Sequence, residues 1–150
     1  MGRDEERPGL TPAADAPQPA FELPITVRAE DIDELGHVNN VVYLGWVQEV
    51  AKGHWFAVTT PEEAENLVWV AIRHELDYRK PAFDGDHLVG RTWIGEAGGV
   101  KCERFVEIRN RDTGDLLMQC RSVWVAVDRR SGRPRRFDPA VMDRFRRPVS

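Results

Sequence analysis

The segment from Asn39 to about Trp55 constrains the fold more than any other part of the sequence. Placed on a helix at about 100° per residue, Gly45, Gln48, Glu49 and Lys52 fall within one arc of roughly 100°, which Val41 shares. The rest of the circumference is apolar, so a helix here must be covered on most of its sides. The arc holds Val41, Gly45, Gln48, Glu49 and Lys52, and the apolar remainder holds Val42, Tyr43, Leu44, Trp46, Val47, Val50 and Ala51.

The remainder of the chain offers mainly strands to cover this helix. One strand, FELPITVRA, begins at Phe21, and LVWVAIRHELDYRK, HLVGRTWIGE, KCERFVEIRN and LLMQCRSVWVAVD follow the helix. The turn signals AGG and RDTGD separate the last three strands so closely that no parallel crossover fits, which predicts an antiparallel meander. We therefore predict an α+β fold in which an antiparallel sheet of about five strands wraps around one long central helix.

Local patterns refine this expectation. Alternation over residues 67–80 predicts one buried strand face made of Val68, Val70, Ile72, Leu76 and Tyr78. A short capped turn and a short helix are also predicted. The turn is TPEE, where Thr60 has capping-box spacing to Glu63 and Pro61 takes the first helical position, and the helix begins after Asp138 with Pro139.

A chain of 150 residues fits a single domain. Half of its ten prolines fall in the first 24 residues, so residues 1–20 are predicted to be a disordered tail and residues 21–150 the folded domain. No run of about 18 apolar residues and no secretory signal is visible, which predicts a cytoplasmic protein with no membrane partner. Cys102 and Cys120 lack a partner at metal-ligand spacing, so free thiols and no metal site are expected.

Charge is distributed unevenly along the chain. Residues 1–75 carry a net −9 and residues 76–150 a net +5, with basic side chains concentrated in RRSGRPRR at 129–136. This run is either a solvated turn or a surface for an anionic partner. No aromatic-rich nucleic-acid motif accompanies it, so nucleic acid is not an expected partner.

The densest polar cluster, EDIDELGHVNN, lies just before the apolar helix. Asn39 or Asn40 can cap that helix, and Gly36 permits a left-handed turn. Asp33 and His37, a carboxylate and an imidazole four residues apart, exceed what a cap requires. They are the candidate catalytic residues.

Residues 31–46, DIDELGHVNNVVYLGW, resemble the D-x-D-x-x-G-H-V-N-N-x-x-Y-L-x-W signature of hotdog-fold thioesterases, which include 4-hydroxybenzoyl-CoA thioesterase and bacterial acyl-CoA thioesterases. The later DYRKPAFDGDHL resembles the Y-x-x-P-A-x-x-G-D segment of that family. The resemblance covers residues 21 to about 145. It implies hydrolysis of an acyl-CoA or related acyl thioester without a cofactor, in a homodimer or homotetramer with active sites at the subunit boundary.

The resemblance also implies roles for individual residues. The catalytic carboxylate of the family falls on Asp33, acting as general base on water or as nucleophile. Its oxyanion-stabilising backbone amides fall near the helix start, at Val38, Asn39, Asn40 and Val41. His37 either orients water or Asp33, or forms a hydrogen bond within the loop. Tyr43 is expected to form a pocket wall.

Other residues are candidates for secondary roles. A CoA nucleotide needs surface cations for its phosphates, and the candidates are Arg104, Arg129, Arg130, Arg133, Arg135 and Arg136. Glu49 matches a helix glutamate of the family and is expected to be a structural partner inside the sheet.

Three alternative functions are weighed against acyl-CoA hydrolysis. Plant acyl-carrier-protein thioesterases resemble HVNNVVYLGW, but they have an Asn where this chain has Leu35, and a Glu-Cys pair where it has Pro81 and Ala82. A non-catalytic acyl-thioester-binding module is a second alternative, against which the retained Asp33 argues. A hydratase or dehydratase is a third, and the histidine-centred motifs of those enzymes are absent.

Overall fold

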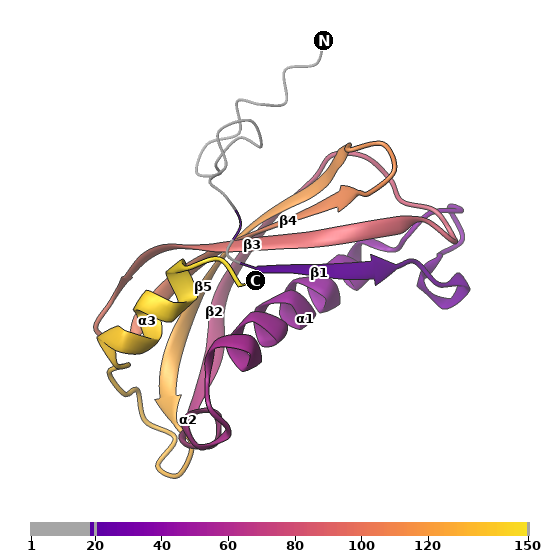
Figure 1. The fold of residues 1–150 in the computed structure, drawn as a ribbon. Coiled ribbons are helices and arrows are strands. Elements are labelled where there is room, and N and C mark those ends of the chain that lie inside the picture. The colour runs from indigo at the N-terminus through magenta and orange to yellow at the C-terminus, as the bar shows by residue number, and fades with distance from the viewer. Residues whose placement is uncertain (1–18, 20, 150) are drawn as a thin grey trace.

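The computed structural model describes Pro19 and residues 21–149, and these form one curved five-stranded sheet with three α-helices (Figure 1). The strand order is β1-β3-β4-β5-β2, and every neighbouring pair is antiparallel, as predicted. The prediction of a disordered tail over residues 1–20 lies outside the described residues, Pro19 apart. The strands are β1 (Phe21–Thr26), β2 (Leu67–Tyr78), β3 (His87–Gly98), β4 (Lys101–Asn110) and β5 (Leu116–Asp128).

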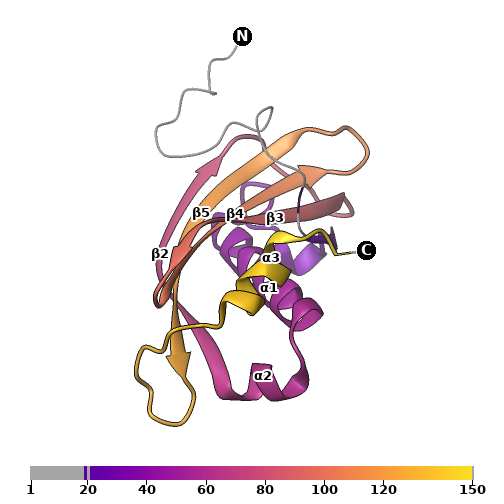
Figure 2. The same ribbon diagram turned by 60° about the vertical axis from the view of Figure 1, so that its left-hand side comes forward.

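The sheet bends around the long helix α1 (Asn40–Val58), which lies along its concave side (Figure 2). The predicted wrapped architecture is therefore confirmed, and α1 runs three residues past its predicted end. Two short helices, α2 (Pro61–Asn66) and α3 (Pro139–Arg146), begin at the predicted caps. No helix in the described part of the chain has the length and apolar character needed to cross a membrane.

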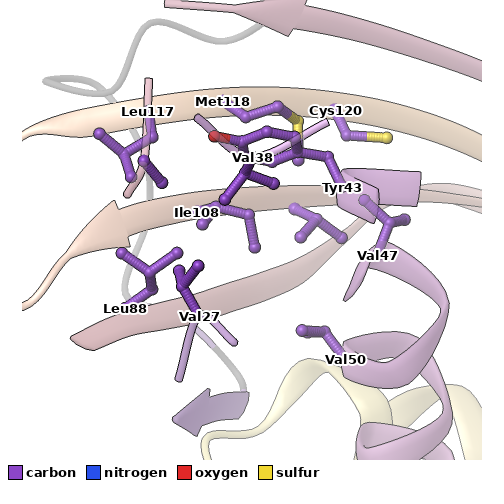
Figure 3. Close-up of a cluster of buried hydrophobic side chains, with 12 residues drawn as sticks. Val27, Val38, Tyr43, Val47, Val50, Leu88, Ile108, Leu117, Met118 and Cys120 are labelled. Atoms are coloured by element: carbon purple, nitrogen blue, oxygen red, sulfur yellow. The ribbon is translucent and has the colours of Figure 1, made fainter. Parts of the chain in front are cut away.

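One face of α1 packs into the main hydrophobic core, where Val47 and Val50 are fully buried. Figure 3 shows these two side chains on α1 in the same cluster as Leu88 and Ile108 of the sheet. The opposite face is exposed at Val41, Gly45, Gln48, Glu49 and Lys52, the arc expected from the sequence. Glu49 was expected inside the sheet, and this was wrong: it lies on the exposed face, 3.7 Å from the Lys52 ammonium.

A second core cluster lies at the C-terminal half of α1, where α3 packs against the same side of the sheet. Phe145 of α3 is 1% exposed and contacts the rings of Trp55 and Trp69. Cys102 and Cys120 are both free and buried on β4 and β5. Burial raises the pKa of each thiol to about 11, so neither is a ready nucleophile.

The predicted facing of β2 was only partly right. The pairing of β2 with β5 shifts register between Ala71 and Arg73, which leaves Ile72 as an extra residue. Because side chains alternate with a period of two, this bulge exchanges the two faces of the strand. Trp69 before the bulge and Leu76 after it therefore both pack on the core, while Val70 and Ile72 are 47% and 54% exposed. Since β2 is also an edge strand, this apolar surface borders an unpaired sheet edge.

Gly90 on β3 lies directly beneath α1. A Cβ atom at this position would overlap Cγ2 of the fully buried Val50. We expect Gly90→Ala to destabilise the fold by about 1–3 kcal/mol, because the helix must shift outward to admit the methyl group. Denaturant unfolding measures this change. Gly98→Ala is the matched control, since a Cβ there meets nothing within 4 Å; equal stability of the two variants would contradict the expectation.

Candidate active site

The polar cluster before α1 folds into a tight reverse turn that leads directly into the helix. Asp33 N donates to His37 O at 3.1 Å, Ile32 and Val38 form a β-bridge, and Asn39 N donates to Asp31 O at 2.9 Å. Gly36 adopts a φ of 86°, the left-handed conformation expected for it. These backbone bonds place Asp33 opposite His37, which lies two residues before the N-cap of the helix.

Asp33 is partly exposed at the start of this turn. Its Oδ1 accepts a hydrogen bond from Leu35 N at 2.9 Å, which fixes the orientation of the carboxylate without neutralising it. A fixed, solvent-accessible carboxylate can accept a proton from water or attack a carbonyl carbon.

His37 does not bond to Asp33 in this structure. Its Nδ1 lies 3.3 Å from the carbonyl oxygen of Val38, which can only accept, so the ring donates there. This is a hydrogen bond within the loop, one of the roles expected for His37, and the role of orienting water stays a prediction.

The amides expected to form an oxyanion site are mostly occupied. Val38 N donates to Ala82 O at 2.9 Å, Asn39 N donates to Asp31 O, and Val41 N donates to Asn39 Oδ1 at 3.0 Å. Asn39 is therefore the helix N-cap. Among the described residues no acceptor bonds to the amide of Asn40. Of the four amides predicted to stabilise the oxyanion, this is the one that remains available as a donor.

Tyr43 lies in the core beneath the loop, 2% exposed. Its ring makes edge contacts with Trp46 and Tyr78, and burial together with Tyr78 raises its pKa to about 12. The raised pKa argues against a role as an acid, and the expected role of Tyr43 as a pocket wall stays a prediction. Tyr78 in turn donates to Asn40 O at 3.1 Å, which ties the end of β2 to the start of α1.

The expectation that Arg104 lies on the surface was wrong. Arg104 is 4% exposed, because β4 alternation points it to the concave side of the sheet under α3. Two members of the basic run are held by the chain itself: Arg129 donates to Glu65 O at 2.6 Å, and Arg135 pairs with Asp128 at 3.3 Å. Arg130, Arg133 and Arg136 are exposed, as a solvated turn predicts.

A cavity of about 340 Å³ opens beside the C-terminal half of α1, between that helix, α2 and the β2 side of the sheet. We call it the α1–β2 pocket. Its walls are mainly apolar and include Trp55, Trp69, Trp124 and Phe145. Its first α1 residue, Gln48, lies eight positions past Asn40, which is about 12 Å along the helix axis.

Sequence reasoning missed His54, which is fully buried beside this pocket and bonds to Arg104. The sequence could have predicted this burial, because His54 lies four residues after Val50 and seven after Val47, on the apolar face of α1. Burial and the neighbouring Arg104 lower the pKa of His54 to about 3, so its ring is neutral at pH 7. Across the described residues no cluster of His, Cys, Asp or Glu has the arrangement of a metal site.

Comparison with known proteins gives a consistent picture. The sequence model of the thioesterase-like superfamily matches residues 27–145. The Bacillus subtilis (strain 168) protein named "Putative acyl-CoA thioesterase YneP" is 28% identical over 123 residues, which cover 79% of this chain and 88% of that protein. The chloroplastic palmitoyl-acyl carrier protein thioesterase of Arabidopsis thaliana is 30% identical over 118 residues, covering 73% of this chain but only 29% of the plant protein.

Among solved structures, a thioesterase from Thermus thermophilus, complexed with coenzyme A and Zn, has a TM-score of 0.73 and 23% identity. The alignment covers 85% of this chain and 92% of that one. At this identity the likeness establishes a shared fold, the hotdog fold.

The assignment of Asn39 as the cap of α1 can be tested by mutation. We expect Asn39→Ala to lower the free energy of unfolding by about 0.5–2 kcal/mol, because Val41 N loses its acceptor. Asn40→Ala is the control, since Asn40 is exposed at the first helical position. Chemical unfolding followed by circular dichroism measures both, and a larger loss for Asn40→Ala would show that the cap is misassigned.

Proposed function

The chain belongs to the thioesterase-like superfamily, and from that premise we propose that it hydrolyses an acyl-CoA to a free acid and CoA. The family and the hotdog fold support thioester hydrolysis in general. The observation that carries the specific proposal is the fixed, partly exposed carboxylate of Asp33 on the turn that leads into α1, together with the amide of Asn40, which has no acceptor among the described residues.

In this mechanism the thioester carbonyl lies at the N-terminus of α1. The amide of Asn40 and the positive end of the helix dipole stabilise the negative charge that develops on the carbonyl oxygen. Asp33 takes a proton from the attacking water, or attacks the carbonyl carbon to give a mixed anhydride that water then cleaves. The C–S bond breaks, and the CoA thiolate leaves and takes up a proton.

CoA is favoured over a carrier protein as the thiol partner. The relative that this chain spans for most of its length is named for acyl-CoA, whereas the chain spans under a third of the plant carrier-protein enzyme. Leu35, which stands where the plant enzymes have an Asn, is 73% exposed and supplies no polar group to the turn.

The active unit is proposed to be a homodimer that pairs β2 with its symmetry mate. β2 is an edge strand with exposed Val70 and Ile72. Pairing it with the β2 of a second copy satisfies the backbone groups at this edge and covers the apolar side chains. An antiparallel two-fold near Ile72 brings the Tyr78 end of one β2 beside the Leu67 end of the other. Tyr78 donates to Asn40 O and so lies beside the turn at residues 33–37, which we call the catalytic turn. The proposed pairing therefore directs the catalytic turn of one subunit toward the α1–β2 pocket of its partner.

The role of Asp33 is tested by Asp33→Asn. We expect turnover of acyl-CoA to fall by about 10²–10⁴, the loss typical of a positioned acid–base group, while the fold is retained because Asn can still accept from Leu35 N. Release of free CoA, measured with a thiol reagent, gives the rate. Glu34→Gln changes the same charge one residue away on an exposed side chain and is expected to leave the rate unchanged. Turnover of Asp33→Asn within about threefold of the parent would remove Asp33 from the mechanism.

The dimer is tested by Ile72→Lys. In the proposed pairing this change places two ammonium groups across the two-fold axis, which opposes association. We expect light scattering to report about twice the 17.1 kDa chain mass for the parent and a shift toward one chain mass for the variant. Phe83→Lys alters an equally exposed apolar side chain away from β2 and should leave the dimer intact. A parent that is monomeric at micromolar concentration would refute the proposed pairing.

A further inference from the structure

Arg104 is a buried cation whose charge meets no carboxylate among the residues that the structure describes. Its Nη1 donates to Thr92 Oγ1 at 2.8 Å and to His54 Nδ1 at 3.0 Å, and both acceptors are neutral. Its guanidinium carbon lies 5.1 Å from the centroid of the Phe145 ring. Nε and Nη2 donate to no described group, so most of its donors are unused.

Other arginines of the same sheet show what this one lacks. Arg91 and Arg109 both pair with Glu107, at 2.9 Å and 3.0 Å, and Arg121 pairs with Glu103. Each of these guanidinium groups is more exposed than that of Arg104. Arg104 is the most buried of these arginines and therefore needs a counter-charge most, but it has none among the described residues. This arrangement costs stability unless a ligand supplies the charge.

Arg104 lines the α1–β2 pocket, and the polar groups of that pocket are biased toward donors. Lys52 and Arg129 also line it, and none of the described residues that line it is acidic. The buried indole N–H groups of Trp69 and Trp124 have no acceptor among the described residues. The pocket thus combines apolar aromatic walls with a buried cation and unpaired donors.

We propose that the α1–β2 pocket receives the distal end of an acyl group that bears a carboxylate, and that Arg104 is the residue that recognises it. The placement of that carboxylate on an acyl group rests on the proposed thioesterase function. The chemistry of the pocket itself does not: apolar walls accept a hydrocarbon body, and a guanidinium with free donors accepts a carboxylate through charge-assisted hydrogen bonds. A methyl-terminated acyl group would fill the same space and leave the cation unpaired.

The activity test compares thioesters of equal length that differ only at the distal carbon: adipoyl-CoA with hexanoyl-CoA, and suberoyl-CoA with octanoyl-CoA. We expect the parent to favour the carboxylate-bearing member of at least one pair by about 10- to 100-fold in kcat/KM. Arg104→Gln, which keeps donors for Thr92 and His54 but removes the charge, should bring that ratio near unity. Arg104→Lys should restore part of the preference.

Arg130→Gln is the control, because it removes the same charge from an exposed arginine outside the pocket and should leave the ratio unchanged. Equal kcat/KM within both pairs for the parent, or an unaltered ratio in Arg104→Gln, would overturn the proposal. Weaker binding of CoA alone by Arg104→Gln would also overturn it, since Arg104 would then serve the nucleotide.

A binding test separates this proposal from the proposed hydrolysis. Octanoate and 1-octanol share a hydrocarbon chain, and only octanoate carries a charge. We expect octanoate to quench the fluorescence of the tryptophans that line the pocket at a concentration about 10- to 100-fold lower than 1-octanol, and Arg104→Gln to abolish this difference. The comparison of the two ligands uses the intact parent, so it stands even if the variant fails to fold.

The two proposals can fail separately. Hydrolysis without any preference for a distal carboxylate would retain the thioesterase and reject the carboxylate pocket. Preferential binding of octanoate without hydrolysis of any thioester would retain the carboxylate pocket and reject its assignment to an acyl substrate. Equal binding of octanoate and 1-octanol by the parent would reject the pocket outright.

Discussion

The packing of α1 into the concave face of the sheet is the contact on which the other features of this protein depend. Val50 rests directly on Gly90, a position without a side chain, and this allows the helix to approach the centre of the sheet. Each end of α1 has a further role. Its N-terminus is held beside the proposed catalytic turn by the bond from Tyr78 to Asn40, and its C-terminal half forms one wall of the α1–β2 pocket.

The bulge in β2 links the fold to the proposed assembly. Without the extra residue at Ile72, the whole strand would keep one alternation and turn Val70 toward the core. With it, both halves of the strand pack on α1 and α3, and the apolar residues at the bulge face outward along an unpaired edge. A local irregularity therefore improves the core of one chain and supplies the surface on which a second chain can pair.

The electrostatics of the two proposed regions are complementary. The catalytic turn presents a carboxylate in a partly solvated setting, where an anionic base is stable in water. The pocket presents a guanidinium in an apolar setting, where charge is expensive and a counter-ion gains most. A substrate with a thioester at one end and a carboxylate at the other would satisfy both regions, and the spacing between them would then select its length.

The sequence by itself determined the element order, the helix caps, the antiparallel meander, the exposed arc of α1 and the candidate turn around Asp33, because these follow from periodicity and local hydrogen bonding. Tertiary structure decided which local donors remained free: bonds to Ala82 and Asp31 occupied two of the four expected amides, the Asn39 side chain occupied a third, and only that of Asn40 has no acceptor among the described residues. It also decided which side chains of β2 face the core, since a single bulge reverses the alternation of buried and exposed side chains along a strand. The burial of Arg104 was decided there too, because its environment comes from His54, Thr92 and Phe145, three residues distant in sequence that meet only when helix and sheet pack.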